Sequence, residues 1–165
     1  MNTNTKTILW SVLASALLLG GLVLASSGSK GDEAVVTGGA SLTALEESYD
    51  FGTVSMAKGE VSHEFKIKNN SAEPITVTKV YTSCMCTKAS IVAASGKAGP
   101  FGMAGHGYIP SINVVVAPGE EAAIIAIFDP AAHGPAGVGP VAREITVEEK
   151  GVAPLTLGFR ATVAP

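Results

Sequence analysis

The chain has 165 residues, of which 47% are hydrophobic and 15% charged, and its formal net charge at pH 7 is −3. This length provides for one ordinary domain plus a short additional segment, and the apolar content is too high for an intrinsically disordered chain. The negative net charge and the lack of any basic run exclude an extended nucleic-acid-binding surface.

Residues 8–25, ILWSVLASALLLGGLVLA, form an apolar segment without charge or proline. A helix of this length just crosses a hydrocarbon core about 30 Å thick, and it exceeds the apolar region usual in signal peptides. The small residues Val23 and Ala25 also suit cleavage after Ala25, so an anchor in the inner membrane and a cleaved signal peptide remain alternatives. Lys6 favours a cytoplasmic N-terminus, which puts the rest of the chain outside the cytoplasm.

The sequence therefore predicts three parts. Residues 1–25 form a hydrophobic helix that is either a signal peptide or a transmembrane anchor. Residues 26–44 are rich in Gly and Ser without a sustained apolar period, which is typical of a flexible linker. Residues 45–165 form the globular domain. Its location is the periplasm or cell exterior, tethered by a single membrane pass or, after cleavage, free in the periplasm or secreted.

The globular part shows the patterns of β-strands. EVSHEFKIK and LTLGFRATV alternate apolar and polar residues with period two, as half-buried strands do. EAAIIAIF is apolar on both faces, which is expected of a central strand between two packed layers. Further short strands are predicted at PITVTKVYT, SINVVVA and AREITVEE, each bordered by turn signals. About seven short strands in this length predict an all-β fold, an immunoglobulin-like antiparallel β-sandwich.

Two Gly-rich stretches, residues 95–110 and 129–140, interrupt the strands. We expect both to be long loops, and loops of this length in a compact domain tend to be functional or mobile. Each contains one histidine, His106 in the first and His133 in the second.

The stretch TSCMCTKAS holds both cysteines of the chain, Cys84 and Cys86. Residues two apart in a regular strand point to the same face, so both sulfurs could meet one ligand. Thiolates suit soft metals, above all Cu(I) and also Zn(II), but two sulfurs do not complete a zinc tetrahedron. Met103, His106 and His133 are candidates for the missing ligands.

Two other interpretations of the cysteine pair stay open. In an oxidising compartment Cys84 and Cys86 are expected to form a disulfide with each other, which is either structural or idle. Such a bond closes a very small ring, so it could also be reduced easily and exchange with other thiols. Apart from a possible Cu(I), no cofactor is predicted.

Other polar residues have structural interpretations. His63 occupies an inward position of its strand and is expected to be partly buried with its hydrogen bonds satisfied. The acidic doublet Glu148–Glu149 is expected on a solvated face. Asp129 and Arg143 could form an ion pair that holds the second Gly-rich loop.

The segment YDFGTVSMAKGEVSHEFKIKNNSAEPITVTKVYTSCMCT resembles the opening of a bacterial envelope family without assigned activity, domain of unknown function 1573. The shared features are Tyr49-Asp50-Phe51-Gly52, Phe65 to Asn69, and Ser83 to Thr87. The later PGEEAAIIAIFDP is similar to the same family and to immunoglobulin-like modules of the Hydin and major-sperm-protein type. Met85 departs from the family, which most often has Gly there. The resemblance spans about residues 47–163 and implies an immunoglobulin-like fold and export.

We therefore predict an exported module of the bacterial envelope, tethered by residues 8–25 if these are not cleaved, that binds a protein partner. The alternatives are a protein that handles Cu(I) or another soft metal, and a thiol-disulfide exchanger. A nucleophile elbow, a phosphate loop and a His-Glu-x-x-His motif are missing from the sequence, so an enzyme is not predicted and no catalytic residue is assigned.

Overall fold

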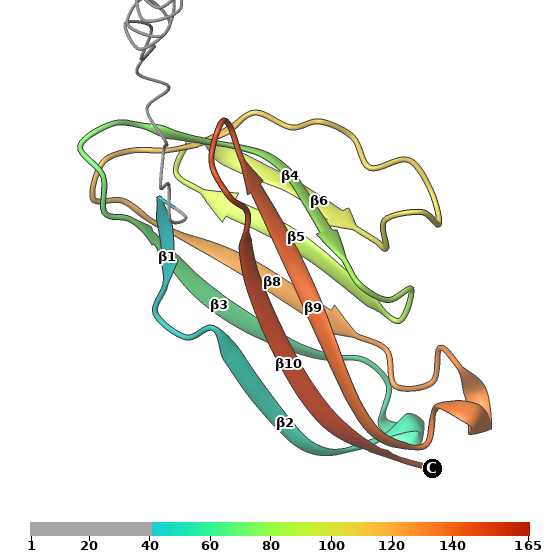
Figure 1. The fold of residues 1–165 in the computed structure, drawn as a ribbon. Helices are drawn as coiled ribbons and strands as arrows, with labels where there is room; N and C mark the ends of the chain where they lie inside the picture. The colour runs from blue at the N-terminus through green and yellow to red at the C-terminus, as the bar shows by residue number, and fades with distance from the viewer. Residues whose placement is uncertain (1–40) are drawn as a thin grey trace, which may run out of the picture. The chain divides into compact units, whose positions relative to one another are not determined.

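A computed structural model describes residues 41–165, which form ten strands in two five-stranded sheets packed face to face (Figure 1). The first sheet has the order β1-β3-β8-β5-β6, with β1 Leu42–Ala44, β3 Val61–Asn69, β8 Glu121–Phe128, β5 Thr87–Ala93 and β6 Gly96–Phe101. The second has the order β2-β10-β9-β4-β7, with β2 Ser48–Ser55, β10 Leu155–Ala164, β9 Gly139–Glu149, β4 Ile75–Thr82 and β7 Val114–Val116. The predicted immunoglobulin-like sandwich is confirmed.

All strand pairs are antiparallel except β2 with β10, which run parallel. Two short 3-10 turns, η1 Met56–Lys58 and η2 Gly134–Gly137, are the only helical elements of residues 41–165. Within that range, no helix has the length and apolar character needed to cross a bilayer. The predicted segment 1–25 and linker residues 26–40 lie outside the described residues.

The core forms where the apolar faces of the strands meet. The predicted inward set of β10 is buried: Leu155, Leu157, Phe159, Ala161 and Val163. In β3, Phe65 and Ile67 are fully buried, as the period-two pattern predicts. Burying each such large side chain contributes about 1.5–3 kcal/mol, so these faces hold the sheets together.

Strand β8 lies at the centre of its sheet as predicted, between β3 and β5. The expectation that both of its faces are covered is wrong. Phe128 and Ile124 point into the core, whereas Ile125 and Ile127 on the other face are partly exposed. Residues 41–165 form only two layers, and none of their elements covers the outer face of β8.

His63 is half-buried, as predicted, and its ring is held on several sides. Its Nε2 lies 2.9 Å from Glu46 Oε2. The ring stacks on Tyr49 with centroids 3.6 Å apart, and the edge of Phe65 is 4.7 Å away. A histidine with these partners supports the structure, and we assign it no ligand.

The first strand of the described residues, β1, begins at Leu42, three residues before the predicted start of the globular part at residue 45. Leu42 is fully buried and pairs with Asn69 at the end of β3. Strand β1 has three residues, which is too few to show a clear alternation of apolar and polar residues after a Gly- and Ser-rich sequence.

The first Gly-rich stretch is not entirely a loop, because its beginning forms β6. This strand pairs with β5 at one edge of its sheet. Gly99 permits the close approach: a Cβ there would lie 2.7 Å from Ser90 Oγ and 2.8 Å from Ser90 Cα, and its φ is +113°. The glycines that suggested a loop therefore belong partly to an edge strand.

Glu149 is only 5% exposed, so the prediction of a solvated face is wrong for this residue. Its Oε1 accepts a hydrogen bond from the Leu42 backbone N–H at 3.2 Å, while Oε2 has no hydrogen-bond partner among residues 41–165. Burial raises the pKa of Glu149, and the hydrogen bond from the Leu42 N–H only partly offsets this. Its neighbour Glu148 is part-exposed and forms an ion pair with Lys79 at 3.2 Å.

We expect Glu149→Gln to stabilise the domain at neutral pH by roughly 1 kcal/mol, because a neutral amide avoids the desolvation cost of a buried carboxylate charge. With its raised pKa, folded Glu149 holds its proton more tightly than unfolded Glu149. The free energy of unfolding therefore falls as pH rises above the ordinary glutamate value of 4.5. Glutamine keeps an acceptor for Leu42 and removes this dependence. Urea unfolding from pH 4.5 to 8 measures the effect; an equal change in Glu148→Gln would contradict it.

Candidate functional site

The two cysteines lie in the turn between β4 and β5, not in a regular strand. Thr87 N–H donates to the Cys84 carbonyl at 3.1 Å and closes this turn. The Thr82 hydroxyl lies 2.9 Å from the Cys84 carbonyl oxygen and 3.0 Å from that of Thr87. Ser83 ties the turn to β9, since its N–H donates to the Glu144 carbonyl at 2.9 Å. The turn is therefore fixed at both ends.

Cys84 and Cys86 form a disulfide, one of the three states that the sequence leaves open, with Cα atoms 5.3 Å apart. The two sulfur-bearing residues differ in environment. Cys86 is 3% exposed and belongs to the core, whereas Cys84 is part-exposed. Between them Met85 points outward and is 56% exposed. The bond thus has one accessible end and one buried end.

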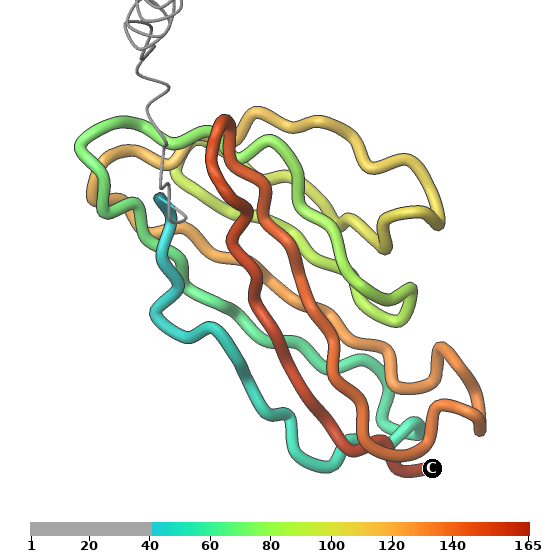
Figure 2. The backbone as a smooth tube through the Cα atoms, in the orientation of Figure 1, coloured from blue at the N-terminus to red at the C-terminus, as the bar shows by residue number. Residues whose placement is uncertain are grey.

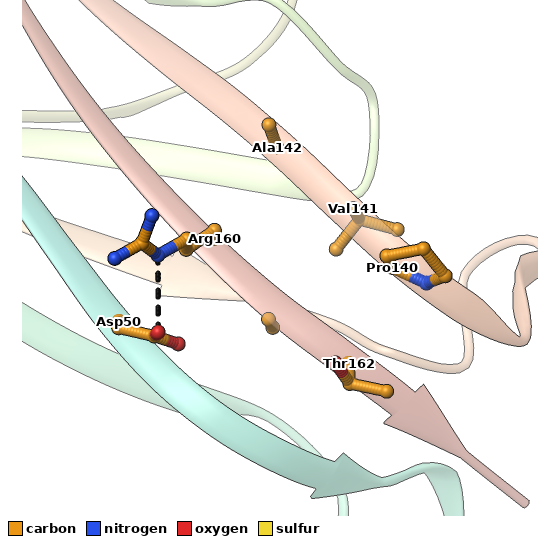
Figure 3. Close-up of a pocket in the computed structure, with 7 residues that line it drawn as sticks. Asp50, Pro140, Val141, Ala142, Arg160 and Thr162 are labelled. Carbon is orange, nitrogen blue, oxygen red and sulfur yellow. Dashed lines mark hydrogen bonds and ion pairs between the residues drawn. The ribbon is translucent and has the colours of Figure 1, made fainter.

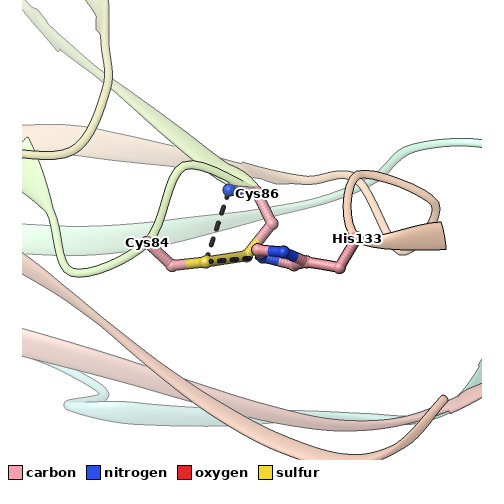
Figure 4. A group of neighbouring side chains, drawn as sticks. All are labelled: Cys84, Cys86 and His133. Atoms are coloured by element: carbon pink, nitrogen blue, oxygen red, sulfur yellow. Dashed lines mark hydrogen bonds between the residues drawn. A yellow bond between two sulfur atoms is a disulfide. The ribbon is translucent and has the colours of Figure 1, made fainter. Parts of the chain in front are cut away.

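Each cysteine has a different nitrogen neighbour. His133 Nε2 lies 3.3 Å from Cys84 Sγ (Figure 4). Arg143 Nε donates a hydrogen bond to Cys86 Sγ at 3.2 Å. The predicted ion pair between Asp129 and Arg143 is not formed; the Asp129 carboxylate instead accepts the Ala131 N–H at 2.8 Å. The Arg143 guanidinium therefore does not pair with Asp129 and instead contacts the buried Cys86 sulfur.

Backbone hydrogen bonds join two further loops to the cysteine turn, and the backbone trace has all three on the same side of the domain (Figure 2). Asp129 N–H donates to the Cys86 carbonyl at 2.9 Å and brings in the loop after β8. Thr82 N–H donates to the Gly102 carbonyl at 3.0 Å and brings in the loop after β6. We call this region, residues 82–87, 102–109 and 129–138, the disulfide end.

The five residues predicted as metal ligands are only partly brought together. In the described part of the chain, the ligand atoms of Cys84, Cys86 and His133 lie within 4.8 Å of one another. His106 is exposed and outside this group. The backbone of Met103 lies next to the cysteine turn, because it pairs with Thr82 in an isolated β-bridge. The structure therefore brings together two cysteine sulfurs and the His133 imidazole, and it separates His106 from them.

The position of Arg143 beside Cys86 was not predicted. A signal for it exists in the sequence: Arg143 has the same strand parity as Ile145 and Val147, which are both fully buried. An arginine at the inward side of a strand end suggests a buried acceptor for its N–H groups.

A second feature is an open cleft of about 370 Å³ on the second sheet (Figure 3). Arg160 Nε donates to Asp50 Oδ2 at 3.0 Å there, and both side chains are mostly exposed. Hydrogen bonds from Gly52 N–H and Arg160 lower the pKa of Asp50. The remaining lining residues are Pro140, Val141, Ala142, Ala161 and Thr162. The charged residues that line this cleft, Asp50 and Arg160, are already joined in an ion pair. We therefore regard the disulfide end, and not this cleft, as the candidate functional site.

Comparison with solved structures gives the fold but no activity. A protein of unknown function from Porphyromonas gingivalis W83 is similar with a TM-score of 0.53 and 15% identity. The similarity covers 73% of this chain and 46% of that protein, so this chain spans less than half its length. A PapD-like domain of human CEP192 has a TM-score of 0.42 at 8% identity, covering 75% of this chain and 85% of that domain.

No curated protein sequence matches the chain. A family model described as protein of unknown function (DUF1573) matches residues 42–103. The matched range contains the Tyr49-Asp50-Phe51-Gly52 start, the end of β3 and the turn with both cysteines. The resemblance to this family inferred from the sequence motifs is thus confirmed over residues 42–103, which include half of the immunoglobulin-like sandwich and the Cys-x-Cys turn.

Proposed function

We propose that the chain is an exported envelope module that binds a protein partner at its disulfide end and catalyses no reaction of small molecules. The proposal rests on the positions of the exposed large hydrophobic side chains. Four are exposed among residues 41–165, and three of them, Met85, Tyr108 and Val138, belong to the loops of the disulfide end.

Exposed large apolar side chains are a common feature of protein-binding surfaces. Tyr108 is 87% exposed and lies in the loop after β6, while Val138 follows η2 in the loop after β8. Tyrosine and methionine are both enriched where proteins meet. Met85 stands on a turn closed by the disulfide, so little conformational entropy is lost when a partner covers it.

Two observations support export. The apolar segment 8–25 precedes the domain, and a cysteine pair oxidised to a disulfide is typical of extracytoplasmic proteins. The domain would then stand in the periplasm, tethered through residues 8–25 or released by cleavage after Ala25.

Crosslinking in cells tests the proposal. A photoreactive amino acid in place of Met85 is expected to crosslink to an envelope protein. The same amino acid at Lys150, in the exposed turn between β9 and β10 at the other end, is expected to give no such product.

A second candidate function is binding of a soft metal, favoured by the three donor atoms within 4.8 Å. Ligands of one metal ion stand about 3–4 Å apart, given bonds of ~2.0–2.3 Å, and two thiolates with one imidazole suit Cu(I). Only the reduced protein could bind. This function predicts one-to-one Cu(I) binding in an anaerobic titration against a chelator, weakened at least tenfold by His133→Ala and unchanged by His106→Ala. Equal affinities in both variants would eliminate His133 as a ligand.

A further inference from the structure

We infer that the Cys84–Cys86 disulfide is polarised, so that a thiol of the bound protein attacks Cys84 and Cys86 is always the leaving sulfur. The inference rests on the proposed function for its substrate class, a protein with a free cysteine. Its chemistry rests on the disulfide end alone. It makes the disulfide end a site where the partner can be held by a covalent bond.

Access selects Cys84 as the sulfur under attack. Thiol-disulfide exchange needs a thiolate to approach one sulfur directly. Cys84 is part-exposed beside the outward-pointing Met85, whereas Cys86 is 3% exposed and packs in the core. A thiol on another protein could therefore reach Cys84 and is excluded from Cys86.

Charge selects Cys86 as the leaving sulfur. Arg143 Nε donates to Cys86 Sγ at 3.2 Å, and the guanidinium is permanently protonated. Its Nη1 donates to the Ala142 carbonyl at 2.7 Å, which fixes the side chain in this position. Negative charge that develops on Cys86 as the bond breaks thus meets a cation already in place. A stabilised thiolate is the better leaving group.

The exchange is balanced without any further oxidant. The partner enters as a thiolate, forms a sulfur–sulfur bond to Cys84, and breaks the Cys84–Cys86 bond. The partner sulfur is oxidised to the disulfide level, and Cys86 is reduced to a thiolate that stays beside Arg143. Return attack by Cys86 on Cys84 releases the partner thiolate and restores the original disulfide, so the covalent link is reversible.

The test uses the whole chain in detergent with reduced glutathione as the thiol probe. The reaction is quenched in acid at early times, free thiols are alkylated, and fragmentation of the peptide with both cysteines shows which sulfur carries glutathione. We expect glutathione on Cys84 and the alkyl group on Cys86, in at least tenfold excess over the reverse. An equal or reversed distribution, or no adduct at all, would overturn the inference.

Arg143→Gln tests the origin of the polarity, with Arg160→Gln as the matched control, since Arg160 is an exposed arginine paired with Asp50. We expect the rate of adduct formation to fall about tenfold in Arg143→Gln, on the scale of one pKa unit of thiolate stabilisation, and to stay unchanged in Arg160→Gln. Equal rates would contradict the role of Arg143. Glutathione needs no partner protein and the crosslinking experiment needs no sulfur chemistry, so the two proposals fail independently.

Discussion

Replacing Asn69 with alanine is expected to lower the free energy of unfolding by about 3 kcal/mol, because four hydrogen bonds of a fully buried side chain are lost. Its Nδ2 donates to the Glu73 carbonyl at 2.8 Å and to the Val116 carbonyl at 2.9 Å. Its Oδ1 accepts from Ser71 N–H at 2.8 Å and from the Ser71 hydroxyl at 2.7 Å.

The bond to Val116 makes Asn69 important beyond its own turn. Asn69 ends β3 of the first sheet, and Val116 belongs to β7 of the second. Alanine would leave the Val116 carbonyl buried without this donor, and each such group costs roughly 1–3 kcal/mol. Asn69 therefore joins the two layers as well as closing the turn before β4.

Asn70→Ala is the matched control. Asn70 is the adjacent residue, of the same type but exposed, and its one side-chain hydrogen bond within residues 41–165 runs from Nδ2 to the Thr43 hydroxyl, at 2.6 Å. We expect its free energy of unfolding in urea to change by less than about 0.5 kcal/mol, as at most surface sites. Equal destabilisation by the two substitutions would show that the buried network of Asn69 contributes little.

Strand patterns with strict alternation predicted the fold well. Every residue expected to face inward is buried in β3 from Phe65 onward and in β10 from Leu155 onward. The reason is that alternate residues of a strand face the core in a two-layer sandwich. In β8 burial also alternates, but hydrophobicity misled: Ile125 is apolar yet partly exposed. Local hydrophobicity does not tell how many layers cover a strand.

The disulfide end could be predicted only in part. The sequence places Cys84 and Cys86 close together by spacing alone, but His106 and His133 are equivalent in sequence: each is a histidine in a Gly-rich stretch. Which of them meets the sulfurs depends on how the loops leave their strands. Hydrogen bonds such as that from Asp129 N–H to the Cys86 carbonyl decide it, and these join segments about 40 residues apart.

Glu149 and Arg143 show a second limit of the sequence. Both are charged residues in β9, and a charged residue is expected on a solvated face unless it has a partner. The partners are Leu42 for Glu149 and Cys86 for Arg143, at 3.2 Å in each case. Contacts across such long sequence separations leave no local signal apart from strand parity.

The largest functional effect is expected at Met85, because this side chain is 56% exposed on the turn that the disulfide closes. A photoreactive residue at position 85 should form a crosslink in cells, and a second substitution, Tyr108→Asp, should abolish it by placing a charge in the apolar contact. Tyr108 is 87% exposed, so the substitution should leave the stability of the domain unchanged. Asp in place of Lys150 is the matched control and should leave the crosslink intact.

The most direct test of the central claim is therefore the crosslinking yield from position 85 relative to position 150 in intact cells. We expect a discrete adduct with an extracytoplasmic protein from position 85, none from position 150, and loss of the adduct in Tyr108→Asp. Equal yields from both positions, or adducts only with cytoplasmic proteins, would contradict an exported module that binds its partner at the disulfide end.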